Sequence, residues 1–139
     1  MRERTFIILK PETLARGFAG EVITRIEKTD LKIIAMKLVT IKPDQAENLY
    51  EIHKEKAFFD NLIDHITSGP VIILLVEGEG AVSTIRKLCG NTNPLKAEAG
   101  SIRRMYGLNI TMNAIHAADS VKNAQRESNI FFGSDEIVN

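Results

Sequence analysis

The 139-residue sequence predicts a mixed α/β fold of the α+β kind, built on a four-stranded antiparallel sheet. Three observations support this prediction. Short apolar runs suit strands, segments with apolar residues every three or four positions suit helices, and the two kinds alternate along the chain. Because no low-complexity linker or repeat divides the sequence, we expect residues 1–139 to form a single domain.

The first half of the chain contains two expected strands and three expected helices. In order, they are a strand at 4–10 (RTFIILK), a helix at 18–30, a strand at 31–40, and two helices at 43–56 and 57–69. The first strand is apolar on both faces, and Pro11 ends it because proline has no backbone donor. In the second strand Ile34, Met36 and Leu38 alternate with their neighbours, as strand residues that share one face do.

The second half repeats this order and ends in a helix. The expected elements are a buried strand at 70–78, a helix at 80–90, a polar loop at 91–107, a strand at 108–116 and a helix at 119–132. In the strand at 108–116, Ile110, Met112 and Ala114 are expected to face a core. Asp119 or Ser120 is expected to cap the final helix.

This order predicts a ferredoxin-like arrangement. Two interleaved β-α-β units give a βαββαβ sheet with its helices on one face. The two helices at 43–69 are then an inserted hairpin, and the helix at 119–132 is a C-terminal addition.

The composition narrows the classes of function. Eighteen basic residues balance eighteen acidic ones, so we do not expect a nucleic-acid-binding protein. The longest apolar run, VIILLV at 71–76, is too short to span a bilayer, and we expect neither a signal peptide nor a membrane partner. A lone Cys89 cannot form an internal disulfide and sits at a core position of a helix, which suits a cytoplasmic protein.

The candidate residues for chemistry do not form a metal site or a phosphate loop. His53, His65 and His116 have no companion at zinc-ligand spacing, and the glycines of GEGAVSTIRK do not have the spacing of a phosphate-binding loop. A phosphate site would therefore use scattered side chains. The candidates are Lys10, Arg86, Thr92, Arg103 and Arg104, each of which taken alone is more often a surface residue.

His116 is the candidate nucleophile, in the stretch NAIHAADS at 113–120. A histidine ring is partly neutral near pH 7, so one nitrogen can attack while an acceptor holds the other. Glu127, on the helix that follows, could be that acceptor. By residue type alone, an ordinary histidine at the end of a strand is the more frequent reading.

Longer blocks of sequence change that balance. Seven blocks have the order and spacing found in the nucleoside diphosphate kinase family. They are ERTFIILKPE, LYEIHKEKAFF, ITSGPVIILLVEGEGAV, GNTNP, GSIR, NAIHAADS and RESNIFF. The sequence resembles that family almost from end to end. The resemblance implies a ping-pong transfer of the γ-phosphate of a nucleoside triphosphate, typically ATP, to a nucleoside diphosphate through a phosphohistidine on His116.

The resemblance also implies roles for ten other side chains. Glu127 would orient the histidine, and Tyr50 would place a hydroxyl beside it. Lys10 and Asn113 would bind the sugar hydroxyls, Phe58 and Leu62 the base, and the phosphates would contact His53, Arg86, Thr92 and Arg103. Mg²⁺ would be held mainly by the nucleotide phosphates and water, without a direct protein ligand.

Family members form tetramers or hexamers, so the resemblance implies a homo-oligomer. The second face of the sheet is expected to be bare of helices and would need to be covered, which also favours an oligomer. Pro94 lies in the loop that the family uses at hexamer contacts, and no long extension follows the final helix, which favours a hexamer over a tetramer.

Three sites depart from the family pattern. Ala118 stands where a serine is usual, so Glu127 lacks one expected hydrogen bond, which is worth on the order of 1 kcal/mol. Arg104 and Met105 replace a common Gly-Asp pair, and Glu12 stands where an aspartate is common. We expect at most a modest loss of rate from Ala118.

Two other readings remain open at this point. One is a ferredoxin-like module that binds nucleotides without turning them over, although such a protein has no use for an unhindered histidine. The other is a nucleic-acid-binding protein with a local basic patch around Lys96, Arg103 and Arg104.

Overall fold

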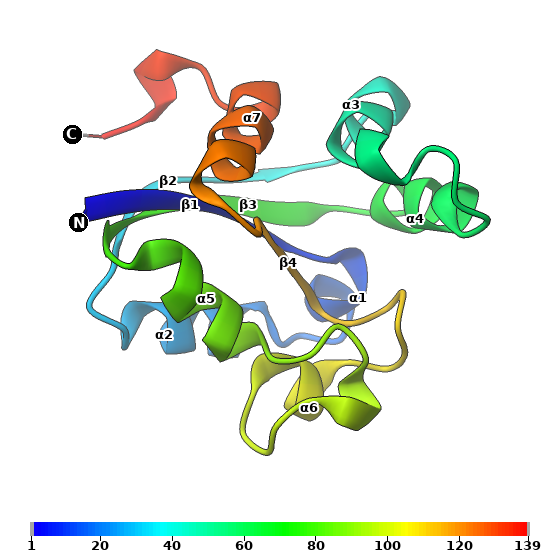
Figure 1. Cartoon of the computed structure of the whole chain (residues 1–139), viewed down its shortest axis with the longest axis horizontal. Coiled ribbons are helices and arrows are strands. Elements are labelled where there is room, and N and C mark those ends of the chain that lie inside the picture. The colour runs from blue at the N-terminus through cyan, green and yellow to red at the C-terminus, as the bar shows by residue number, and fades with distance from the viewer. Residues whose placement is uncertain (1, 139) are drawn as a thin grey trace.

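The computed structural model describes residues 2–138. Its elements keep the predicted alternation and add several short helices (Figure 1). They are β1 (Arg2–Leu9), α1 (Pro11–Ala15), α2 (Ala19–Glu27), β2 (Lys32–Val39), α3 (Pro43–Leu49), η1 (Glu51–His53), α4 (Phe59–Ile66), β3 (Val71–Glu79), α5 (Ala81–Cys89), η2 (Pro94–Lys96), α6 (Ile102–Tyr106), β4 (Ile115–Ala117), α7 (Val121–Phe131) and η3 (Ser134–Glu136).

The four strands form one antiparallel sheet in the order β2-β3-β1-β4, which confirms the predicted α+β fold. β1 lies inside the sheet and pairs with β3 from Arg2 opposite Glu79 to Leu9 opposite Ile72. Its second half is buried on both faces, which explains why that segment is apolar without alternation.

Helices cover both faces of the sheet, so the prediction of one helical face is wrong (Figure 1). Phe6 and Ile8 of β1 pack in one core cluster with residues of α3, α4 and α7, whereas Ile7 and Leu9 pack in a second cluster with residues of α2, α5 and α6. The inserted hairpin and the C-terminal helix thus cover the face that the ferredoxin-like arrangement leaves open. A bare sheet face is therefore no argument for an oligomer.

The fourth strand is much shorter than the predicted 108–116, because β4 spans only Ile115–Ala117. The Asn109 side chain accepts hydrogen bonds from the backbone N–H groups of Thr111 (2.9 Å) and Met112 (2.8 Å), which closes a turn where the strand was expected. Ile110 is consequently 62% exposed and does not face a core.

The second strand contains a bulge that the pattern did not reveal. The register with β3 shifts between Ile33 and Ala35, and Ile34 and Ala35 both lie in the first core cluster. The alternation is inverted beyond this point, so Met36 and Leu38 are 53% and 65% exposed on a strand at the edge of the sheet.

Helix boundaries also differ from the predictions. A short α1 follows Pro11, the expected helix at 43–56 ends at Leu49 and continues as the 3₁₀ turn η1, and the loop at 91–107 contains η2 and α6. Ser120 is the cap of α7, because its hydroxyl accepts a hydrogen bond from Asn123 N at 3.1 Å.

Cys89 is 1% exposed in the second core cluster, as expected of a small core residue, and burial raises the pKa of its thiol to about 11. No helix within residues 2–138 has the length and apolar character needed to cross a bilayer.

Candidate active site

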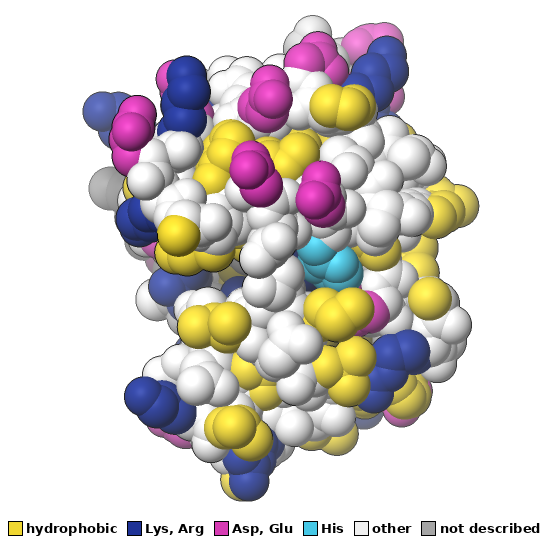
Figure 2. Space-filling model, turned by 90° about the vertical axis from the view of Figure 1, so that its right-hand side faces the viewer, with side chains coloured by type: hydrophobic (Ala, Val, Ile, Leu, Met, Phe, Trp, Pro, Cys, Tyr) yellow, Lys and Arg dark blue, Asp and Glu magenta, His cyan; other side chains and the backbone are white. Residues whose placement is uncertain are grey.

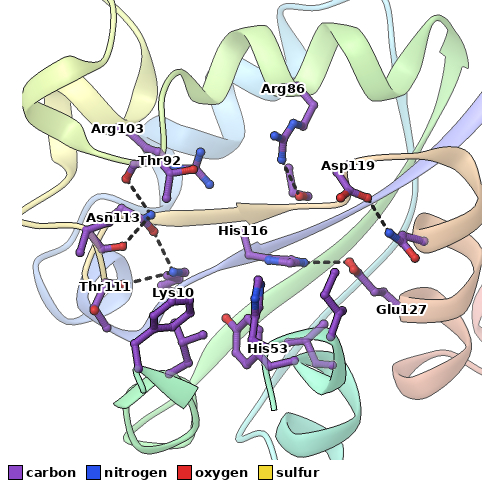
Figure 3. A pocket seen from close by; sticks show the side chains of 18 residues that line it. Lys10, His53, Arg86, Thr92, Arg103, Thr111, Asn113, His116, Asp119 and Glu127 are labelled. Carbon is purple, nitrogen blue, oxygen red and sulfur yellow. Dashed lines mark hydrogen bonds and ion pairs between the residues drawn. The ribbon is translucent and has the colours of Figure 1, made fainter. Parts of the chain in front are cut away.

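A cavity of about 340 Å³ lies between the α3–α4 hairpin and the segment that leads from α5 to β4. Figure 3 shows side chains from both sides pointing toward its centre. All eleven side chains that were given a role above line this cavity: Lys10, Tyr50, His53, Phe58, Leu62, Arg86, Thr92, Arg103, Asn113, His116 and Glu127. Residues up to 117 positions apart in the sequence, Lys10 and Glu127, are thus brought into one site.

His116 is held in one orientation by a carboxylate. It lies on β4 opposite Ile8 of β1, and its Nε2 is 2.8 Å from Glu127 Oε1 on α7 (Figure 3). The rings of Phe6 and Tyr50 stand edge-on to it, with centroids at 6.3 and 6.0 Å. When Nε2 carries the proton and donates to Glu127, Nδ1 is left as the nitrogen with a free lone pair.

The chain reaches this geometry because α7 begins just after β4. Ser120 caps the helix, and Glu127 follows seven residues later, almost two turns along, on the buried face with Ala124 and Ser128. The carboxylate is therefore carried back over the strand that bears His116.

Two arginines hold the backbone on either side of His116. Arg103 of α6 donates from Nη2 to Ile115 O at 2.8 Å and from Nη1 to Gly90 O at 2.9 Å, while Arg86 of α5 approaches Ala117 O at 3.4 Å. Burial lowers the pKa of Arg103, and its Nε has no protein partner within the described chain. These guanidinium groups fix β4 and place positive charge beside the histidine.

Lys10 and Asn113 form a second polar cluster at the other end of β4. Lys10 Nζ donates to Asn113 Oδ1 at 2.7 Å and to Thr111 O at 3.1 Å, and Asn113 Nδ2 donates to Thr92 O at 3.0 Å (Figure 3). Burial lowers the pKa of Lys10 to about 8; nearby Glu12 opposes this shift and Arg103 adds to it.

The hairpin wall of the cavity is mostly aromatic and apolar. Phe58 is 44% exposed, and the centroid of its ring lies 5.5 Å from that of His53, whose Nδ1 is buried without a partner within residues 2–138. Burial and nearby Lys56 lower the pKa of His53. Burial, and to a smaller extent the negative charge of Glu127, raises the pKa of Tyr50 far above its usual value, so its hydroxyl stays protonated.

The remaining basic residues do not extend the site. The Arg104 side chain donates from Nη1 to Leu95 O at 3.2 Å, and neither Arg104 nor Lys96 lines the cavity. On the face shown in Figure 2, lysine and arginine side chains are scattered among acidic and apolar ones and form no continuous basic patch.

The side chains of the cavity do not suit a metal ion held by the protein alone. Within the described residues, no three His, Cys, Asp or Glu side chains cluster at metal-ligand distance. The cavity has two carboxylates: Glu127 pairs with His116, and Asp119 accepts from Asn123 Nδ2 at 2.6 Å, which lowers the pKa of Asp119. These residues fit a divalent cation that arrives with an anionic ligand.

Several lining residues had no predicted role, namely Leu49, Ile52, Ile110, Thr111, Ala117, Asp119 and Asn123. Ile110 was missed because it was assigned to a core strand. Asp119 was considered only as a helix cap, although its place three residues after His116 could have marked it as part of the site.

The cavity therefore unites an oriented histidine, a wall of guanidinium and ammonium groups, and an exposed aromatic ring. Positive charge around a nucleophile suits the transfer of a phosphoryl group, and an exposed ring suits stacking of a base. Fold and site together define a phosphotransferase that acts on nucleotides.

Comparison with known proteins identifies the family. Residues 3–137 match the family model described as nucleoside diphosphate kinase. The chain is 50% identical over 137 residues to the nucleoside diphosphate kinase of Archaeoglobus fulgidus, covering 99% of this chain and 91% of the relative, and 48% identical over 136 residues to that of Thermosipho africanus, covering 98% and 92%.

Solved structures agree. The nucleoside diphosphate kinase of Aquifex aeolicus superimposes with a TM-score of 0.96 at 36% identity, covering 99% of this chain and all of that one. The halophilic enzyme of Halobacterium salinarum, solved in complex with CDP, gives 0.96 at 38% identity and covers 100% of this chain and 93% of the other. The chain belongs to the nucleoside diphosphate kinase family, and it is an enzyme with that activity.

Proposed function

We propose that His116 carries the phosphoryl group between two nucleotides. Nδ1 attacks the γ-phosphorus of a nucleoside triphosphate such as ATP, a P–N bond forms, and the bond to the bridging oxygen breaks to release the diphosphate. A terminal oxygen of a second nucleoside diphosphate then attacks the same phosphorus and frees the ring. The observation that carries this proposal is the 2.8 Å contact between Nε2 and Glu127, which directs Nδ1 away from the carboxylate.

The polar wall would align the phosphates. The cavity that holds His116 is also lined by Arg86, Arg103, Thr92 and His53, and the buried Nε of Arg103 and Nδ1 of His53 have no partner within the described residues. A loose transition state asks mainly for alignment and positive charge, which fixed guanidinium groups supply without reorganising. The protonated Tyr50 adds a hydroxyl donor beside His116.

The rest of the nucleotide would lie along the cavity. Lys10 and Asn113 already form a hydrogen-bonded pair whose ammonium and amide groups suit sugar hydroxyls. Phe58, with Leu62 beside it, offers a ring face on which any base can stack, which accounts for a site that is indifferent to base identity.

Mg²⁺ would enter with the nucleotide. Its phosphates and water would supply most ligands, and Asp119, which stays ionised, could accept a hydrogen bond from that water. When bound, the ion neutralises charge on the phosphate oxygens. The chain's own residues orient the histidine and the phosphates.

We also propose a domain organisation, an oligomeric state and a location for the protein. Residues 1–139 act as a single domain, because both core clusters pack on one sheet. A homo-oligomer, with a hexamer favoured over a tetramer, is supported by exposed apolar residues on the edge strand β2 and at Leu95 beside Pro94. The buried, unpaired Cys89 is compatible with the cytoplasm.

The direct test is covalent labelling. The protein is incubated with γ-labelled ATP and Mg²⁺, isolated, and examined for acid-labile, base-stable label, and GDP is then added to ask whether the label leaves as GTP. We expect label on the peptide that contains His116. His116→Ala should abolish it, while His53→Ala, which keeps the nucleophile, should still take label; label on any other residue contradicts the proposal.

A further inference from the structure

Ala114 has a backbone conformation that its surroundings must enforce. It is the one non-glycine residue with a positive φ, 77°, within residues 2–138, and it is fully buried between Asn113 and the strand that carries His116. Side chains with a Cβ rarely adopt this region, so such a residue persists only where its neighbours over-determine it.

The cap residue of α1 and two residues in its first turn hold both polar backbone groups of Ala114. Its carbonyl accepts hydrogen bonds from Lys10 N at 3.0 Å and from Thr13 Oγ1 at 2.8 Å. Its N–H donates to Glu12 Oε2 at 2.8 Å. Among these contacts, the one from Glu12 depends on a charged side chain.

The second oxygen of Glu12 reaches the opposite wall of the cavity. Glu12 Oε1 is 2.6 Å from Nε2 of His65, which lies on α4, the helix that begins just after Phe58 and carries Leu62. The two side chains are only 6% and 12% exposed. One carboxylate therefore bridges the helix of the base-binding wall and the strained backbone next to Asn113.

Glu12 is ionised in this setting. Burial would raise its pKa, but the hydrogen bonds from His65 and from the Ala114 N–H outweigh burial and lower the pKa below its usual value. Hydrogen bonds to a buried carboxylate are stronger than neutral ones, so this bridge can hold both partners in place.

We propose that Glu12 is a positioning residue that sets the distance between the two walls of the cavity, through His65 on one side and Ala114 on the other. The inference rests on the proposed function, because it assigns the base to the α4 wall and the transferred phosphoryl group to His116, on the strand that follows Ala114. The two arms of Glu12 have separable consequences. The contact with His65 governs how well the base is held, and the contact with Ala114 governs how His116 is presented.

The test uses steady-state kinetics on the full chain, after labelling has shown that the wild-type protein forms a phosphohistidine. His65→Phe keeps a ring but removes the bond to Glu12, and we expect the KM for nucleoside diphosphates to rise about tenfold with kcat nearly unchanged. Glu12→Ala removes both arms, and we expect the same rise in KM together with a fall in kcat of about tenfold.

A second substitution separates positioning from stability. Glycine adopts a positive φ without strain, so Glu12→Ala combined with Ala114→Gly should recover much of kcat but not KM. Glu12→Gln keeps the length of the side chain and should lie between wild type and Glu12→Ala. If Glu12→Ala does not fold, Glu12→Gln and His65→Phe are compared with wild type in its place.

Glu136→Gln is the matched control. Glu136 likewise bridges a backbone N–H, that of Gly133, and a basic side chain, Lys37, but it lies outside the cavity. We expect its KM and kcat to equal those of wild type. The proposal is overturned if the Glu12 variants lower the melting temperature while leaving KM and kcat unchanged, or if Ala114→Gly restores no kcat to Glu12→Ala. Absence of label in wild type instead contradicts the proposed function.

Discussion

The two walls of the cavity differ in how their side chains are held. On the α5–β4 side, Arg103 and Lys10 each make two hydrogen bonds within the protein. On the hairpin side, the rings of Tyr50 and Phe58 pack against the ring of His53, and Phe58 is 44% exposed. One wall is fixed by hydrogen bonds, and the other presents an open ring face.

This difference matches what each part of the nucleotide demands. Phosphoryl transfer needs reacting atoms that are aligned within narrow limits, so the groups near His116 are anchored to the backbone. Stacking on a ring tolerates different bases, so the hairpin wall needs an accessible aromatic face more than a rigid one. Substitutions on the two walls should therefore differ in size and in the kinetic parameter that they change.

The largest effect is expected on the anchored wall. Arg103→Lys keeps the charge but cannot donate to both Gly90 O and Ile115 O, which leaves buried carbonyls unpaired. Losing charge-assisted bonds worth about 3 kcal/mol predicts a fall in kcat of about a hundredfold. Stopped-flow measurement of histidine phosphorylation tests this, and a change confined to KM would mean that Arg103 binds without aligning.

A smaller effect is expected on the hairpin wall. Phe58→Ala removes a stacking surface worth about 2 kcal/mol, which predicts a rise in KM of about thirtyfold with little change in kcat. ADP, GDP and CDP should be affected alike. A loss restricted to one base would show that the ring selects between bases rather than accepting all of them.

The polar wall also predicts a dependence on pH. Because burial lowers the pKa of Lys10 to about 8, the empty enzyme loses this ammonium group as the pH rises through that value. If the protonated form binds the nucleotide, KM should rise by at most about tenfold between pH 7 and pH 9. Lys10→Gln should have a higher KM at pH 7 and a flatter profile; an unchanged slope in that variant would assign the titration to another group.

The sequence predicted the fold class and a set of side chains that line one cavity, but it missed several details of the secondary structure around them. All eleven proposed side chains converge because their order and spacing are those of one family, and that pattern holds even where secondary structure is misassigned. Asn113 was placed on a strand and lies in a loop, yet it still reaches Lys10.

The errors arose where one side chain or one extra residue overrides a periodic pattern. Asn109 folds back on two N–H groups and ends an alternation that would otherwise continue into β4. A bulge near Ile34 inverts the faces of Met36 and Leu38. The spacing of apolar residues predicts neither the Asn109 turn nor the bulge. It also does not predict on which face of the sheet an inserted hairpin will pack.

The smallest predicted effect concerns Ala118, beside the contact that directs the nucleophile. Glu127 Oε1 is paired with His116, whereas Arg126 Nη2 is 3.9 Å from Oε2, beyond hydrogen-bond distance, so Oε2 can accept another hydrogen bond. Ala118→Ser should supply it and raise the rate of histidine phosphorylation about fivefold, the equivalent of about 1 kcal/mol.

Ala124→Ser is the matched control, because it also adds a hydroxyl to a buried alanine of the first core cluster, where the hydroxyl can bond to the helix backbone instead. A gain in Ala118→Ser alone would show that orientation of His116 still limits the rate, whereas equal rates in both variants would show that Glu127 already holds the ring as firmly as the reaction requires.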